Sequence, residues 1–224
     1  MPLAVALLVL AAISIAPSAL GKTNEGAIAF SSTRDGNAEA YVLDPSARDM
    51  IRLTNVSSID QDPAISPDGK SIAFASSRNG DLDIYVLQIA DPAAVTRVVQ
   101  NTSADANPAW SPDGKKLAFV SNRRGNKDIH VVDLGVRGGT SGLIDGNSAE
   151  DDHPAWSPDG KQIAFASKRT SKWQVYVAPA NGGPPTRLGT GKANDTQPVW
   201  SPQGQLIAFA SDRGGAYEIY TMKP

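Results

Sequence analysis

The stretch NPAWSPDGKKLAFVSNRRGNKDIHV, residues 107–131, decides the fold because close copies of it recur along the chain. Full copies are DPAISPDGKSIAFASSRNGDLDIYV (62–86), HPAWSPDGKQIAFASKRTSKWQVYV (153–177) and QPVWSPQGQLIAFASDRGGAYEIYT (197–221). A fifth copy, GAIAFSSTRDGNAEAYV (26–42), lacks the opening part. The shared phenylalanines are 44, 45, 46 and 44 residues apart, at Phe30, Phe74, Phe119, Phe165 and Phe209. Constant spacing of this kind indicates a repeat architecture.

Each copy predicts several short β-strands. Around Trp110 one strand is expected, followed by Ser111–Gly114, whose residue types suit a type I turn. KKLAFVS and DIHVVD follow as a second and third strand, separated by a turn at 122–127. A weaker fourth strand is expected at Arg52–Thr54, Arg97–Gln100, Leu143–Ile144 and Arg187–Gly189. This pattern predicts an all-β protein, a β-propeller of about five four-stranded blades. The repeats lie near 26–54, 62–100, 107–144, 153–190 and 197–221.

Composition excludes several classes of protein. The 224 residues include no cysteine, and 21 Lys and Arg oppose 23 Asp and Glu for a net charge of −2. Without an excess of positive charge, nucleic acid is not an expected partner. The absence of cysteine excludes thiol nucleophiles, iron-sulfur clusters and cysteine-ligated zinc.

The first 21 residues predict export. They carry no charged side chain, and 3–16 are apolar except for Ser14. This run is shorter than the roughly 20 residues that span a bilayer and suits a secretory signal peptide, with the mature chain beginning near Lys22. An uncleaved anchor is the alternative. We therefore expect a signal peptide at 1–21, a propeller at 22–224, a periplasmic or secreted location, and no stable membrane span after cleavage.

The repeat xPAWSPDGKxIAFxSxRxGxxxIYV closely resembles that of the TolB-like β-propeller family, which also supplies the propellers of tricorn-like and prolyl-oligopeptidase-like peptidases. The resemblance covers Gly26–Thr221. It implies a periplasmic protein that binds a peptidoglycan-associated lipoprotein and other envelope components. TolB itself has an additional N-terminal domain and six blades, whereas this sequence contains five copies, so it does not match TolB proper.

Ring closure is a separate question. The first copy lacks the innermost strand, and the last copy stops after its third strand. In the TolB-like pattern the end of the chain completes the first blade. We therefore expect an open or incompletely closed ring, with self-association through the incomplete first blade. A truncated propeller of a larger protein is an alternative reading.

The histidines and tryptophans mostly fit repeat positions. His130 occupies the position of Tyr41, Tyr85, Tyr176 and Tyr220, which makes it a structural variant. Trp110, Trp156 and Trp200 share one position, which predicts core packing between blades. No GxSxG pentapeptide occurs, since GTSGL at 139–143 fails at its last residue, so a serine-peptidase site is not expected.

One arginine per copy recurs two residues after a serine, at Arg34, Arg78, Arg123, Arg169 and Arg213. We expect each of them to tie its turn to an acidic neighbour, such as Asp68, Asp113 or Asp159, because a guanidinium suits a carboxylate. A basic ring for an anionic ligand is the alternative.

The candidate binding site lies where the chain enters the innermost strands. Polar residues stand there in pairs: Asp60 and Asp62, Asp105 and Asn107, Asp151 and His153, Asp195 and Gln197. In a propeller they would surround one mouth of the central channel. Either each aspartate caps its own turn, or they form a shared polar site, for which Ca²⁺ is a conceivable ligand because it prefers oxygen donors. No other cofactor is expected.

Together these features predict an exported, non-catalytic propeller that binds an envelope protein or a peptidoglycan-associated component. The alternative is a propeller-type hydrolase or lyase acting on polysaccharide or peptide at the channel, with His153 and Asp151 or Asp152 as its acid-base candidates.

Overall fold

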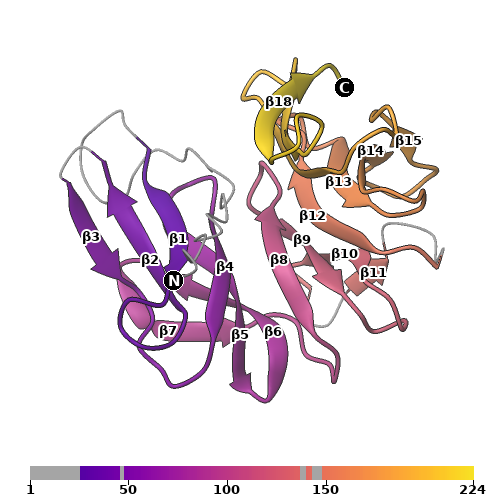
Figure 1. Cartoon of the computed structure of the whole chain (residues 1–224). Helices are drawn as coiled ribbons and strands as arrows, with labels where there is room; N and C mark the ends of the chain where they lie inside the picture. The colour runs from indigo at the N-terminus through magenta and orange to yellow at the C-terminus, as the bar shows by residue number, and fades with distance from the viewer. Residues whose placement is uncertain (1–25, 46–47, 137–139, 143–147) are drawn as a thin grey trace, which may run out of the picture.

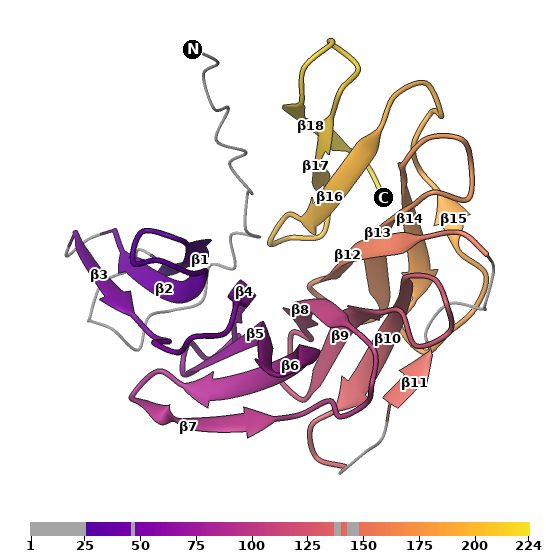
Figure 2. The same cartoon turned by 60° about the horizontal axis from the view of Figure 1, so that its bottom comes forward.

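The computed structural model describes residues 26–45, 48–136, 140–142 and 148–224, so the predicted signal peptide lies outside the described residues. The described residues form antiparallel β-sheets and no helix (Figure 1). Five sheets follow one another in chain order around a ring (Figure 2). The predicted all-β propeller with five blades is confirmed. In this part of the chain no helix could cross a membrane.

Each sheet is built from consecutive strands. Blade 1 contains β1 (Ile28–Ser32), β2 (Glu39–Asp44) and β3 (Asp49–Arg52). Blade 2 contains β4 (Asp60–Ile65), β5 (Ser71–Asn79), β6 (Asp81–Gln88) and β7 (Asp91–Arg97). Blade 3 contains β8 (Asp105–Trp110), β9 (Lys116–Ser121), β10 (Asp128–Asp133) and β11 (Thr140–Gly142). Blade 4 contains β12 (Asp151–Trp156), β13 (Gln162–Ser167), β14 (Gln174–Pro179) and β15 (Thr186–Arg187). Blade 5 contains β16 (Asp195–Trp200), β17 (Ile207–Ser211) and β18 (Glu218–Met222).

The ring is open between its first and last blades. Among the residues that the structure describes, blade 1 has three strands, with β1 at its inner edge, and blade 5 has three, with β18 at its outer edge. Within the described ranges, no strand of blade 1 pairs with a strand of blade 5, and Figure 2 shows the gap between them. The expected incomplete closure is confirmed.

The repeat pattern predicted the fourth strands at positions too far along the chain. In blades 1, 2 and 4 they end at Arg52, Arg97 and Arg187, where we expected them to begin. Leu143–Ile144 lies outside the described residues. The apolar residues that suggested strands leave the sheet edge and enter the core instead. Leu53 and Val99 are 5% and 2% exposed, and Leu188 donates its N–H to the carbonyl of Val175. Apolar character here marks core packing after the strand, not the strand itself.

Blades pack together through two different apolar faces. Alternation along IAFAS sends Phe74 and Ile72 of β5 toward blade 1 and sends Ala73 and Ala75 toward blade 3. The same pairing of a large face on a small one recurs at the other interfaces between successive blades. Phenylalanines in this position are at most 2% exposed in blades 2 to 5. Because both faces are apolar, a blade needs a neighbour on each side to bury them.

The tryptophans add a polar link to this packing. Trp110 Nε1 donates to the carbonyl oxygen of Ala64 on the preceding blade, at 2.9 Å. Trp156 repeats this with Ala109 at 3.1 Å, and Trp200 with Ala155 at 3.2 Å. The fourth copy of this position is Ile65, and the described part of its preceding blade includes no inner strand to supply a carbonyl. The prediction of core packing is therefore correct, and the indole hydrogen bond explains why tryptophan is the residue used.

An aromatic pair fills the centre of each blade. Phe74 and Tyr85 stack with ring centroids 5.9 Å apart, and the guanidinium of Arg78 lies over both rings. In blade 3 the partner of Phe119 is His130, 3% exposed, with no hydrogen-bond partner for its Nε2. Burial, assisted by the positive charges of Arg123 and Arg124, lowers the pKa of His130 to about 4. His130 is therefore a neutral ring in a tyrosine position, as predicted.

Trp156→Phe is expected to lower the free energy of unfolding by about 1 kcal/mol, because it leaves the partly buried Ala109 carbonyl without its donor while keeping an aromatic ring. Urea unfolding followed by circular dichroism measures the change. Trp173→Phe is the matched control, since Trp173 is likewise partly buried but precedes β14 at a blade edge. Equal destabilisation by both substitutions would contradict the role of the indole hydrogen bond.

His130→Tyr is expected to make the fold less sensitive to acid. An unfolded histidine binds a proton near pH 6.5 and folded His130 only near pH 4, so acidification below 6.5 favours the unfolded state. Between pH 7.5 and pH 5 the wild type should lose about 2 kcal/mol of stability that the variant keeps. Urea midpoints at both pH values test this, with Tyr176→Phe at the equivalent position of blade 4 as the control that retains the wild-type loss. Parallel losses in the wild type and His130→Tyr would refute the assignment.

Candidate functional site

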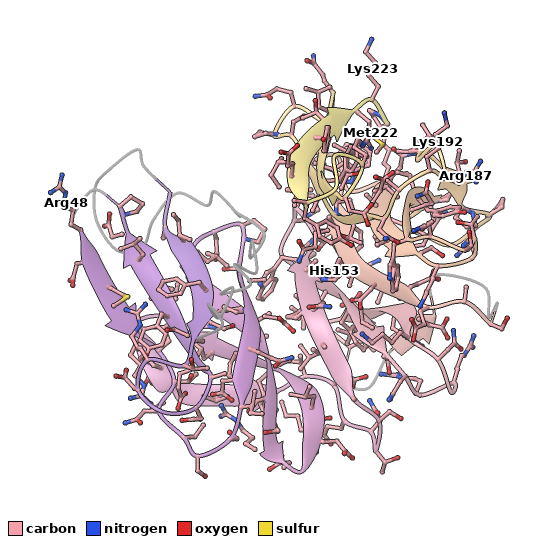
Figure 3. All side chains as sticks on the ribbon, viewed as in Figure 1. Arg48, His153, Arg187, Lys192, Met222 and Lys223 are labelled. Carbon is pink, nitrogen blue, oxygen red and sulfur yellow. The ribbon has the colours of Figure 1, made fainter. Side chains whose placement is uncertain are left out.

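The four inner strands share a bulge that places one polar residue in a left-handed conformation. Register slips by one residue within β4, β8, β12 and β16. The residue at each slip has a φ of 50° to 53°: Asp62, Asn107, His153 and Gln197. Left-handed backbone is costly for most side chains and best tolerated by Asn, Asp and His. All four side chains are partly exposed, and Figure 3 places His153 on the inner side of the ring. These are four of the predicted site residues.

The other four predicted site residues begin the same strands and are buried. Asp60, Asp105, Asp151 and Asp195 are at most 1% exposed. In blade 2 the carboxylate of Asp60 accepts from Ser76 Oγ at 2.5 Å and from the Arg78 guanidinium at 3.0 Å. Equivalent arginine pairs at 3.1 to 3.3 Å are Arg123 with Asp105, Arg169 with Asp151, and Arg213 with Asp195. Through these contacts, each aspartate links the start of the inner strand to the hairpin between the second and third strands of its blade.

Pairing of the repeat arginines with turn acids was wrong. Asp68 is bound locally: it accepts from Ser66 Oγ at 2.6 Å and from the Lys70 N–H at 3.1 Å, and these bonds lower its pKa. Asp113 and Asp159 are held in the same way in their turns. The arginine reaches the first residue of the inner strand instead, because strand register places Asp60 directly opposite Ser76.

Three of the left-handed residues gather with two further side chains into one polar group. We call Asp62, Asn107, Lys127, Asp152 and His153 the channel-mouth cluster. Asp152 is at its centre: its carboxylate accepts from Asn107 Nδ2 at 2.5 Å and from Lys127 Nζ at 2.9 Å. His153 Nδ1 lies 3.5 Å from Asp152 Oδ1. Side chains of blades 2, 3 and 4 thus meet at one end of the inner strands, and within the described residues no hydrogen bond joins Gln197 of β16 to them.

The electrostatics separate the two carboxylates of the cluster. Burial raises the pKa of Asp62, although the backbone N–H of Asn107 and the charge of His153 oppose this. Burial would also raise the pKa of Asp152, but the positive charges of His153 and Lys127 outweigh it and hold the pKa below its ordinary value. Asp152 is therefore an anion with a fixed cationic partner, and Asp62 is the more readily protonated acid.

The cluster offers hydrogen-bond donors and acceptors and no nucleophilic hydroxyl. The Nδ1 atom of His153 is buried and has no hydrogen-bond partner, whereas the lysine side chain is 51% exposed. Within the described ranges, no group of three or more His, Asp or Glu residues is arranged to hold a metal ion. The buried repeat aspartates already bind the arginine and the serine of their own blade, as Asp60 does.

The repeat alignment predicted three members of the cluster, Asp62, Asn107 and His153. It did not identify Asp152, the central residue, as a binding residue. Asp152 stands where the other full copies have Gln61, Ala106 and Thr196. An acid unique to one copy of a repeat was the available signal. Lys127 carried no comparable signal, because it lies in a variable turn and its contact with Asp152 spans 25 residues.

Comparison with solved structures finds TolB from Acinetobacter baumannii, with a TM-score of 0.79 and 29% identity over 88% of this chain and 49% of that one. A TolB candidate from Agrobacterium tumefaciens matches with a TM-score of 0.72 and 24% identity, over 88% of this chain and 67% of that one. An oligogalacturonate lyase in complex with manganese shares the fold at 17% identity and a TM-score of 0.66, over 88% and 59%.

The chain spans about half the length of the Acinetobacter protein. Among curated protein sequences, no relative matches. The family described as the TolB beta propeller domain matches four overlapping segments, residues 10–98, 62–148, 93–192 and 140–224. These segments cover nearly the whole sequence, and each spans about two successive blades. The chain belongs to the TolB beta propeller domain family.

Proposed function

We propose that this chain is an exported, non-catalytic propeller of the cell envelope that binds a partner protein through the channel-mouth cluster. The observation that carries the proposal is the cluster itself, in which Asn107, Lys127 and His153 surround the carboxylate of Asp152. The backbone N–H of Asn107 also reaches Asp62, so the cluster joins three blades. Such groups, held on a rigid scaffold, suit recognition of polar main-chain and side-chain groups of a protein segment. Likeness to TolB supports an envelope protein or a peptidoglycan-associated component as the partner.

The chemistry of the cluster favours binding over catalysis. Asp152 is held as an anion by Lys127, so it is poorly suited to donate a proton. His153 Nδ1 is too far from Asp152 Oδ1, at 3.5 Å, for the short hydrogen bond that orients a catalytic histidine. Solved lyases and peptidases with this fold are below 20% identical and share only the architecture.

Within this proposal the predicted site residues divide into two groups. Asp62, Asn107, His153 and Gln197 are partly exposed and contact the partner. Asp60, Asp105, Asp151 and Asp195 are buried and hold the inner strands in place. A periplasmic location belongs to the same proposal. Ca²⁺ would have to compete with lysine for Asp152, so the proposal does not require it.

Asp152→Asn is expected to weaken binding of the lipid-free domain of a peptidoglycan-associated lipoprotein from the same bacterium by tenfold or more. The substitution keeps the size of the side chain and removes the charge that positions Asn107, Lys127 and His153. Isothermal titration calorimetry measures the dissociation constant. A thermal melt of each variant separates lost binding from lost fold.

Asp91→Asn is the matched control, because it removes one carboxylate from the hairpin at the other end of blade 2. It should leave the dissociation constant unchanged. Unaltered binding by a folded Asp152→Asn variant would exclude the cluster as the site. Turnover of a glycan or peptide by the wild type that Asp152→Asn abolishes would favour the enzymatic alternative.

A further inference from the structure

Blade 1 carries a preformed subsite for an aspartate that the described residues do not supply. In blades 2 to 5 the repeat arginine makes three kinds of contact: with the serine two residues before it, with an aromatic ring of its own blade, and with the inner-strand aspartate. Arg34 makes the first two. Its Nε donates to Ser32 Oγ at 2.9 Å, as Arg78 Nε donates to Ser76 Oγ. Its guanidinium lies 5.5 Å from the centroid of Phe30 and 5.0 Å from that of Tyr41.

The third contact is missing because the described residues give blade 1 no inner strand. Arg34 Nη1 donates only to Met50 Sδ, a weak acceptor, and within the described ranges no carboxylate forms an ion pair with Arg34. Strand β1 pairs with β2 on one side and is the end of its sheet on the other. A row of unpaired backbone groups therefore lies beside a guanidinium in the geometry that binds aspartate elsewhere in this chain.

We propose that β1 accepts an extended segment of a partner protein as an added antiparallel strand, with an aspartate of that segment bound by Arg34 and Ser32. The register follows from the complete blades. Asp60 pairs with Ser76 and Ile65 with Ile72, across a bulge. On β1 the corresponding positions are Ser32 and Ile28. The segment that fits has the pattern Asp-X-X-Pro-(Ala or Val)-(Ile or Trp), with the bulge before its proline.

A partner protein suits this edge better than a second folded copy of the chain. Every inner-strand aspartate of a folded copy is already bound to its own arginine, at 3.0 to 3.3 Å. A copy could donate one only by breaking open a blade and exposing both of its apolar faces. An extended partner segment has no such cost beyond its own ordering, and its main chain supplies the strand hydrogen bonds. The negative charge of its aspartate complements Arg34.

A fluorescently labelled synthetic peptide with the sequence of residues 194–203, NDTQPVWSPQ, is the probe. Fluorescence anisotropy should show saturable binding to the full chain. Arg34→Ala should weaken it by tenfold or more, because it removes the charged partner of the peptide aspartate. Arg48→Asn is the matched control: it removes an exposed arginine of the same blade, and asparagine tolerates the left-handed backbone there.

The peptide aspartate supplies the second arm of a double-mutant cycle. Its replacement by asparagine should weaken binding to the wild type to a similar extent and have little further effect on Arg34→Ala. Absence of peptide binding to the wild type, or equal binding by wild type and a folded Arg34→Ala variant, would overturn the proposal. Concentration-dependent dimerisation of the chain that Arg34→Ala abolishes would also overturn it, in favour of a second copy as the occupant.

A disulfide experiment tests the register of the added strand. The natural chain has no cysteine, so a single introduced thiol has no competitor within the chain. Ser31→Cys places a thiol opposite the position after the peptide aspartate, as Ala75 stands opposite Gln61. A peptide with cysteine in place of its threonine should form a disulfide with this variant under mild oxidation. A peptide with cysteine one position further along should react at least severalfold more slowly, because a shift of one residue turns the side chain to the other face. Equal yields would contradict the proposed pairing. Arg34 and Ser32 lie outside the channel-mouth cluster, so Asp152→Asn should leave peptide binding unchanged. The nearest link between the two sites is the Asp62 N–H, which donates to Ser31 Oγ at 3.1 Å.

Discussion

Both faces of each blade are apolar, and this constraint governs the whole molecule. A strand such as IAFAS sends a phenylalanine to one side and alanines to the other, so no blade buries its core alone. Large faces pack on small ones at each successive interface, and an indole hydrogen bond from the next blade fixes three of them. At the open side of the ring, one apolar face remains exposed to solvent. Ile219 of blade 5 is 56% exposed, while its counterparts Ile84 and Ile129 are fully buried.

The polar residues of the repeat link the strands within a blade, whereas the apolar faces hold successive blades together. Asp60, Ser76 and Arg78 connect the start of the inner strand to the next hairpin and keep the arginine over the aromatic pair. In blade 1, whose described residues include no inner strand, Arg34 keeps its contacts with the serine and the aromatic rings. The arginine is positioned by its own serine and rings, and the aspartate binds to a site that already exists.

The repeat alignment was enough to predict the blades, the shared tryptophan position and the residues that enter the inner strands. It could not identify partners that are set by strand register. Asp68 is nearer to Arg78 in sequence than Asp60 is, yet Asp68 is satisfied within its own turn and only Asp60 lies beside Ser76. Lys127 and Asp152 meet across two blades for the same reason. Local spacing predicts strands and turns, whereas a contact between hairpins depends on how the sheets pack.

The left-handed residues of the inner strands separate the chemistry of this protein from its stability. Asp62, Asn107, His153 and Gln197 have nearly the same backbone geometry but offer an acid, an amide, an imidazole and a longer amide. The bulge that positions them recurs with four different residues at the slip. Side chains at these four points can therefore be exchanged during evolution without rebuilding a blade, provided that they tolerate a positive φ. A ring of such positions is a means by which one scaffold can acquire new binding preferences.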